Sequence, residues 1–303
     1  MSTLRETIRD LTAQHLDTGY MVMGQCLSAV GWVGGTLPER KDMTELPCSD
    51  VAGAYFAVGA ALAGKKPIFI LRYQGFTWFA ASAIVNYAAK SKALWGRPCP
   101  MLIRAIAMEG GIGPVAGSSH HSLFTRMPGI KVFATMTPGE WRAAYEEFMA
   151  GDDVVYLSEH RGAYDQYEEL SAYFGDEQPG IVLFPISITR FSAVEASLNL
   201  CKEHDVIAAV HHLCQLKPLA TSRDALYDLR KARHGGIVID DDYPSGAASD
   251  IAIQLHTLTG ARMRVLGLDD RTAGFAARVD NLPPDKDRIK KFVVELIKEE
   301  NQT

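Results

Sequence analysis

The sequence predicts an α/β protein made of two parallel-sheet, three-layer domains. Short, uniformly apolar segments such as Ile68–Leu71 are typical of strands buried on both faces of a parallel sheet. They alternate with helical stretches through short connections, as in other parallel α/β domains. The alternation stops at a polar stretch and then resumes. We therefore expect a first domain at 1–165, a linker at 166–179 and a second domain at 180–303.

The elements of the first domain follow from apolar spacing and from local stop signals. Gly64 should end the second helix in a left-handed cap, and Pro67 cannot continue it. Thr137, Pro138 and Glu140 have the spacing of a capping box with proline at the first helical position. We expect helices at 4–15, 50–63, 79–95 and 138–150, and strands at 20–23, 68–71, 101–106, 131–134 and 154–157.

The second domain repeats the alternation of strand and helix. Its apolar runs are again short and continuous, and its last helical stretch is charged and amphipathic. We expect strands at 181–186, 206–211, 236–240 and 263–267, and helices at 193–204, 223–231, 247–258 and 285–300.

Composition limits the classes of function. The 303 residues are 47% hydrophobic and 22% charged, as in ordinary globular proteins. A net charge of -5 without a basic cluster argues against a nucleic-acid partner. We expect no secretory signal and no membrane contact, since no apolar run approaches the roughly 18 residues that span a bilayer. The five scattered cysteines predict a reducing, cytoplasmic location rather than a disulfide framework.

The stretch Pro47–Phe76 is the most informative part of the chain. Asp50 opens a helix of small apolar residues, and Phe76 follows the next strand, where open α/β sheets bind their ligands. The free N–H groups and the dipole of the helix should lower the pKa of a carboxyl there. The residues alone allow two interpretations of Asp50, a helix cap or a functional carboxylate.

Two glycine-rich segments lack a nucleotide-binding pattern. Gly111, Gly113 and Gly117 have the spacing GxGxxxG with a proline inside, which excludes the nicotinamide fingerprint. The segment Gly31–Gly35 is open to two interpretations, a surface turn or a contact with a cofactor or partner.

Two polar clusters are candidates for chemistry. The adjacent pair His120 and His121 in a glycine-rich loop indicates a functional site. Such a pair would also suit a metal, but the sequence shows no third ligand, so we assign none. The run Asp240-Asp241-Asp242 could bind a cation or basic groups of a partner. Such a run is more often a solvated loop, which is what we expect here.

An ordered set of segments resembles a known family. PCSDVAGAYFAVGAALAGKKPI (Pro47–Ile68) is similar to the pyrimidine-binding segment of the beta subunits of thiamine-diphosphate-dependent 2-oxo acid dehydrogenases, in the transketolase superfamily. The resemblance continues, in order, through residues 82–96, 120–122, 128–140, 154–165 and 213–219. It implies a thiamine-diphosphate pyrimidine-binding domain followed by a transketolase C-terminal-like domain.

The resemblance implies roles for individual residues. Asp50 falls on the carboxylate that hydrogen-bonds the aminopyrimidine and activates the cofactor, where the family usually has the longer Glu. Phe76 matches the aromatic residue that stacks on the pyrimidine, and Cys48 is placed with both as cofactor-binding. His121 matches the family histidine, so His121 or its neighbour His120 would transfer protons on the substrate.

The resemblance also implies a partner. The family binds diphosphate and magnesium through a GDG motif, which this chain lacks. The chain would thus supply the pyrimidine half of the cofactor site to an alpha-type subunit that carries the magnesium, in a heterotetramer with a two-fold contact between its own copies. The expected reaction is decarboxylation of a small 2-oxo acid with acyl or aldehyde transfer. Two alternatives stay open: the C-terminal half of a split transketolase, or a non-catalytic scaffold subunit.

Overall fold

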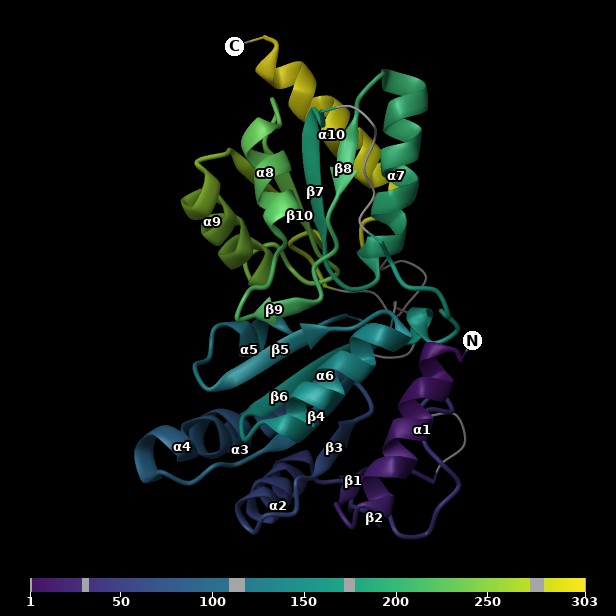
Figure 1. Ribbon diagram of the computed structural model, residues 1–303, viewed down its shortest axis with the longest axis vertical. Coiled ribbons are helices and arrows are strands. Elements are labelled where there is room, and N and C mark those ends of the chain that lie inside the picture. The colour runs from purple at the N-terminus through teal and green to yellow at the C-terminus, as the bar shows by residue number, and fades with distance from the viewer. Residues whose placement is uncertain (1, 29–32, 109–117, 172–177, 273–280, 303) are drawn as a thin grey trace.

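Two β-sheets, each with helices on both faces, organise the chain (Figure 1). The structure is a computed structural model that describes residues 2–28, 33–108, 118–171, 178–272 and 281–302. The predicted class, α/β with two parallel sheets in three-layer domains, is confirmed. Part of Gly31–Gly35, all of Gly111–Gly117 and part of the expected linker lie outside the described residues.

In the described part of the chain, the first sheet has seven strands, and six of them are parallel. The strands are, in spatial order, β2 (Thr44–Glu45), β1 (Val22–Gly24), β3 (Ile68–Leu71), β4 (Met101–Ala107), β6 (Val154–His160), β5 (Ile130–Ala134) and β9 (Gln215–Lys217). The exception is β9, which runs antiparallel to β5. All four residues of β3 are buried, as expected for a strand covered on both faces.

The side chains of β3 show how the two faces are covered. Ile68 and Ile70 pack in one core with α1 (Leu4–Asp17) and α6 (Pro138–Ala150). Phe69 and Leu71 point to the opposite face, because successive side chains of a strand alternate. That face is covered by α2 (Asp50–Leu62), α3 (Thr77–Ala83), a π-helical turn (Ile84–Ala88), α4 (Ala89–Trp95) and the short α5 (Ser122–Thr125).

The second sheet is smaller and wholly parallel among the described residues. Its strands are, in order, β11 (Met263–Leu266), β10 (Gly236–Ile239), β7 (Ile181–Pro185) and β8 (Ala208–Val210). The helices α7 (Thr189–His204) and α10 (Lys286–Glu300) cover one face, and α8 (Arg223–Lys231) and α9 (Ala247–Thr259) cover the other. The predicted elements of this half are present, with α7 beginning four residues earlier than expected.

The helix end predicted at Gly64 is confirmed, and the capping box predicted at Thr137 is formed only in part. Gly64 has the predicted left-handed backbone, with φ of +80°, just after α2. Thr137 caps α6 through the amide of Glu140, and Pro138 is the first helical residue, as predicted. The reciprocal bond of the capping box is not formed at Thr137, because the Glu140 carboxylate accepts from the Met136 amide and pairs with Arg190 instead.

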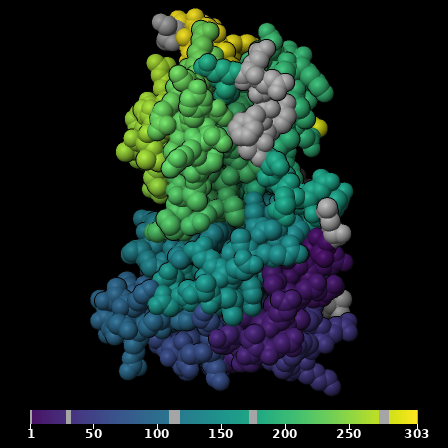
Figure 2. Space-filling model, viewed as in Figure 1, coloured from purple at the N-terminus to yellow at the C-terminus, as the bar shows by residue number. Residues whose placement is uncertain are grey.

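The two domains pack against each other, and a strand of the second half of the chain joins the sheet of the first domain (Figure 2). The strand β9 comes from the second half of the chain but extends the first sheet. One apolar core also contains side chains of both sheets, including Phe69 and Phe184. The ion pair between Arg190 of α7 and Glu140 of α6 crosses the same boundary, at 2.8 Å. The strand β9 was not predicted from the sequence, because three residues carry too little periodicity to be recognised.

None of the helices in the described residues is long and apolar enough to cross a membrane.

Candidate functional site

Asp50 lies in the first turn of α2, beside the end of β1. Its Oδ1 accepts a hydrogen bond of 3.1 Å from Nε2 of the buried Gln25. The expected lowering of the Asp50 pKa is wrong. Partial burial raises the pKa, against the opposing effects of its own backbone amide, the Arg72 charge and the Gln25 hydrogen bond. The loss of water around the carboxylate therefore outweighs the helix terminus.

Arg72 connects Asp50 with Phe76. The guanidinium lies 5.2 Å from the centre of the Phe76 ring, and its charge also acts on Asp50. Nη1 of Arg72 lies 2.6 Å from Cys26 Sγ. Phe76 is half-buried in a 3₁₀ turn, Gln74–Phe76, directly after β3. Asp50 and Phe76, two of the three residues predicted to bind the cofactor, therefore both interact with Arg72. Arg72 itself was not predicted from the sequence.

Cys48 is not part of this group in the described contacts. Its side chain is exposed to solvent, and no described contact joins it to Asp50 or Phe76. Its role in cofactor binding therefore stays a prediction.

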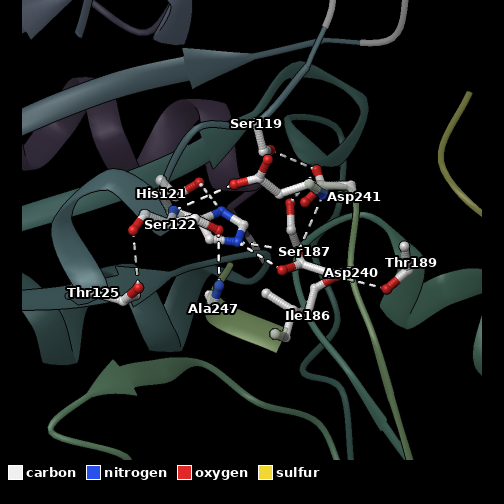
Figure 3. A network of polar contacts seen from close by, with 12 residues as sticks. Ser119, His121, Ser122, Thr125, Ile186, Ser187, Thr189, Asp240, Asp241 and Ala247 are labelled. Atoms are coloured by element: carbon white, nitrogen blue, oxygen red, sulfur yellow. Dashed lines mark hydrogen bonds and ion pairs between the residues drawn. The ribbon is translucent and has the colours of Figure 1, made fainter. Parts of the chain in front are cut away.

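His121 is completely buried between the two domains (Figure 3). Its Nε2 lies 3.0 Å from Asp240 Oδ1, and its Nδ1 lies 3.2 Å from Ser158 Oγ on β6. Burial by itself lowers the pKa of this imidazole. Asp240, and then Asp242 and Asp241, outweigh burial and raise the pKa to about 10. His121 is therefore the positive partner of a buried carboxylate.

His120 has a different environment from its neighbour. Its backbone amide donates to Gln74 Oε1 over 2.6 Å, which ties the histidine loop to the turn after β3. Its ring stands edge-on to Trp78, with 6.0 Å between the ring centres, and lines an interdomain cavity. Burial lowers the pKa of His120, while Asp242 raises it and His121 lowers it further. Of the two histidines, only His120 is among the residues that line this cavity.

The cavity has a volume of about 1140 Å³ and lies between the sheets. Apolar, acidic and basic side chains all line it. Its charged lining residues are Arg126, Lys131, Lys217, Asp153, Asp242 and Asp250. Nζ of Lys217 is already bound to the carbonyls of Thr125 and Met127, at 2.7 and 2.5 Å. A site of this size can hold a small molecule with both polar and apolar parts.

The expectation that Asp240-Asp241-Asp242 forms a solvated loop is wrong. The three side chains are 0%, 1% and 4% exposed, because the run follows β10 directly and points into the interdomain space. Ser119 and Ser187 donate to Asp241 Oδ2 over 2.7 and 2.8 Å. These partners come from loops far away in the sequence, so local pattern could not have revealed them.

The residues around Asp50 fit one half of thiamine diphosphate. An aminopyrimidine needs a carboxylate acceptor and an apolar ring platform, and Asp50 and Phe76 offer these, with the charge of Arg72 acting on both. A diphosphate needs a magnesium site, and the sequence has no GDG motif to build one. The chain fits the pyrimidine end of the cofactor and lacks the family's motif for the other end.

Comparison with known proteins finds a matching family in the first domain. The family "Transketolase, pyrimidine binding domain" matches residues 38–166. The acetoin:2,6-dichlorophenolindophenol oxidoreductase beta subunit of Cupriavidus necator is 29% identical over 232 residues, 70% of this chain and 66% of the relative. The mitochondrial pyruvate dehydrogenase E1 beta subunit of Saccharomyces cerevisiae is 26% identical over 330 aligned residues, 97% of this chain and 88% of the relative.

Solved structures with the same fold extend the similarity to both domains. A split-gene transketolase, described as an inactive beta4 tetramer, has a TM-score of 0.75 at 15% identity and covers 98% of each chain. A transketolase from Campylobacter jejuni has a TM-score of 0.74 over 97% of this chain and 46% of that one. Residues 38–166 therefore match the transketolase pyrimidine-binding domain, and over longer stretches the chain is similar to beta subunits of acetoin oxidoreductase and pyruvate dehydrogenase.

Proposed function

We propose that this chain is the beta-type subunit of a heteromeric, thiamine-diphosphate-dependent enzyme that acts on 2-oxo acids. The observation that carries the proposal is the arrangement of Asp50 and Phe76 around Arg72, within the segment that matches the pyrimidine-binding family. When bound, thiamine diphosphate supplies a nucleophilic carbon that adds to the substrate carbonyl and accepts the electrons released by decarboxylation.

The protein groups have separate tasks in this proposal. Asp50 would accept a hydrogen bond from a pyrimidine ring nitrogen, and Gln25 would orient the Asp50 carboxylate through its own 3.1 Å hydrogen bond to Oδ1. Phe76 offers its ring to the pyrimidine, and stacking of this kind contributes about 0.5–1.5 kcal/mol beyond area burial. His120, at the cavity wall, exchanges a proton with a substrate oxygen, while the buried His121 holds the loop in place through Asp240.

An exposed apolar face supports assembly with a partner. Large side chains on neighbouring helices remain open to solvent, and Tyr55 of α2 packs edge-on to Tyr87 of the π-helical turn with 5.4 Å between ring centres. The exposed residues are Val51, Tyr55, Phe56, Leu62, Trp78, Phe79, Tyr87, Leu94 and Trp95. We call these nine residues the apolar face. A patch of this kind is typical of a protein–protein interface.

The proposed partner is an alpha-type subunit that carries the diphosphate and magnesium ligands, in a heterotetramer with two copies of this chain. The test is turnover of 2-oxo acids by the chain alone, by the partner alone and by both. We expect activity only from the mixture. Full thiamine-dependent activity of the isolated chain would contradict a shared cofactor site, and an inactive mixture would favour a scaffold subunit.

The cavity gives reason to test a second reaction. Arg126 lines it and suits a phosphorylated substrate, whereas Lys131 pairs with Glu147 and Lys217 already donates to two backbone carbonyls. This favours the alternative of a split transketolase that transfers a two-carbon ketol unit between sugars. Assaying the mixture with 2-oxo acids and with sugar phosphates separates the two reactions. We expect the 2-oxo acids to react faster, and preferential turnover of sugar phosphates would reverse the assignment.

A further inference from the structure

A buried cluster of three carboxylates and one imidazole lies where the domains meet (Figure 3). Asp240 and Asp241 leave the end of β10, and His121 reaches them from the first domain. Among the described residues, the only ion-pair partner of Asp240, Asp241 and Asp242 is His121. Burying a carboxylate is costly unless it is paired and hydrogen-bonded, so one imidazole leaves this cluster with an excess of negative charge.

One atom of the cluster also lacks a hydrogen bond. Asp241 Oδ2 accepts from Ser119 and Ser187, but Oδ1 of the same buried side chain has no hydrogen-bond partner among the described residues. Buried polar atoms are almost always satisfied. A buried, unpartnered carboxylate oxygen in a negatively charged cluster points to a positive ligand.

The ligand atoms have the separations that a metal ion needs. One atom each from His121, Asp240 and Asp241 lies within 4.8 Å of the others. In octahedral coordination, adjacent ligands at about 2.1 Å from the ion are about 3.0 Å apart, close to the 3.0 Å between His121 Nε2 and Asp240 Oδ1. Opposite ligands are about 4.2 Å apart in this geometry. If the most widely separated pair took opposite positions, the cluster would close on a cation after a shift of roughly half an ångström.

From this geometry we propose that His121, Asp240 and Asp241 bind a divalent first-row transition cation such as Mn²⁺ or Zn²⁺, and that the His121 imidazolium releases its proton to solvent when the ion binds. The mixture of one imidazole nitrogen and two carboxylates suits such ions, whereas Mg²⁺ and Ca²⁺ prefer oxygen ligands alone. Asp242, the next residue, lines the interdomain cavity and marks the entry path from solvent. The ion would link the two domains, and it is separate from the magnesium proposed for the partner subunit.

A proton is the competing way to neutralise the cluster. Burial, together with Asp240, raises the pKa of Asp241 to about 7, against the effect of His121 and of the two serine hydrogen bonds. A protonated Asp241 would need no metal. The experiment must therefore measure metal binding directly, and it does not depend on the proposed enzymatic activity.

The test is titration of the full chain with Mn²⁺, without thiamine diphosphate, followed by electron paramagnetic resonance. We expect one ion per chain, a raised melting temperature and no displacement by a tenfold excess of Mg²⁺. Asp241→Asn, which keeps the side-chain size, and His121→Gln should each weaken binding by at least about 10–100-fold. Asp250→Asn is the matched control, because Asp250 is an exposed carboxylate in the same cavity and should leave binding unchanged.

Several outcomes would overturn the proposal. One is the absence of binding at about 1 mM Mn²⁺, a concentration at the weak end for protein cation sites; the negative charge of the cluster would then be neutralised by protons. The others are equal Mn²⁺ affinity of Asp241→Asn and the parent chain, and displacement of Mn²⁺ by equimolar Mg²⁺. Circular dichroism checks folding, and if His121→Gln fails to fold, Asp241→Asn decides the question alone.

Discussion

Nε2 of Gln25 donates a hydrogen bond to Asp50 Oδ1 over 3.1 Å, and this contact joins the end of β1 to the first turn of α2. It places a neutral amide against the carboxylate proposed to activate the cofactor. Partial burial raises the pKa of Asp50, and the hydrogen bond from Gln25 opposes that rise. The contact with Gln25 therefore favours the ionised form of the Asp50 carboxylate.

Asp50→Asn should slow proton exchange at the thiazolium carbon of the cofactor by about 10²–10⁴-fold in the presence of the partner subunit. Asparagine keeps the size of the side chain but removes the negative charge. Nuclear magnetic resonance of the exchange measures the effect directly, and Asp224→Asn, an exposed aspartate in the first turn of α8, serves as the control. If Asp50→Asn exchanges as fast as the parent, Asp50 is only a residue of the helix start.

Gln25→Leu should raise the pKa of Asp50, because it removes a hydrogen bond that stabilises the charged carboxylate. The acid limb of the rate profile should move upward by up to about one pH unit, the value of one hydrogen bond. The rate on the alkaline side should change little. A profile that drops equally at every pH would instead indicate loss of positioning.

Arg190→Met should destabilise the chain by about 3–5 kcal/mol, because it leaves the Glu140 carboxylate without its partner at the domain boundary. The double variant Glu140→Gln with Arg190→Met should recover most of this loss. Urea unfolding measures both. The solvent-exposed pair Lys286–Glu195, also at 2.8 Å, is the control, and breaking it should move the midpoint little. If breaking either ion pair lowered the unfolding free energy equally, burial of the Glu140–Arg190 pair would not be the cause of the loss.

Acid should destabilise the protein through His15. Burial lowers the pKa of His15 from 6.5 to about 4, and this burial outweighs its backbone hydrogen bonds. The unfolded chain therefore takes up the proton first, so the contribution is fully present above pH 6.5 and is lost as pH falls toward 4. The difference corresponds to about 3 kcal/mol.

Unfolding free energies at several pH values check this prediction. His15→Gln should flatten the slope between pH 6.5 and 4 relative to the parent, while the exposed His256→Gln should leave it unchanged. Buried His160 and His212 also have lowered pKa values, so the parent retains further acid sensitivity. An identical slope in His15→Gln would show that the unfolded state does not protonate ahead of the folded one.

Phe56→Glu should prevent assembly with the partner subunit without unfolding the chain. Phe56 belongs to the apolar face and is 52% exposed, so a charge there meets water in the monomer but would be buried in an interface. Leu258→Glu, 53% exposed on α9 in the second domain, is the matched control. Sedimentation measures the assembly. If Phe56→Glu still forms the heterotetramer, the interface with the partner subunit does not include the apolar face.

The sequence by itself determined the fold class and most of its elements. Apolar runs such as Ile68–Leu71 and stop signals such as Gly64 act within a few residues, so the sequence alone locates them. The ordered family segments likewise pointed to Asp50 and Phe76. A strand of three residues, such as β9, has no comparable local signal, because only its pairing with β5 makes it a strand.

The tertiary structure alone decided the electrostatics of the sites. Gln25, Arg72 and Asp50 come from three separate segments, and the water they exclude raises a pKa that the helix start was expected to lower. In the same way, the packing of the two domains brings His121 close to Asp240 and Asp241, a grouping that the sequence did not reveal. Burial and charge depend on distances between segments that are remote along the chain, and these distances exist only once the domains have packed.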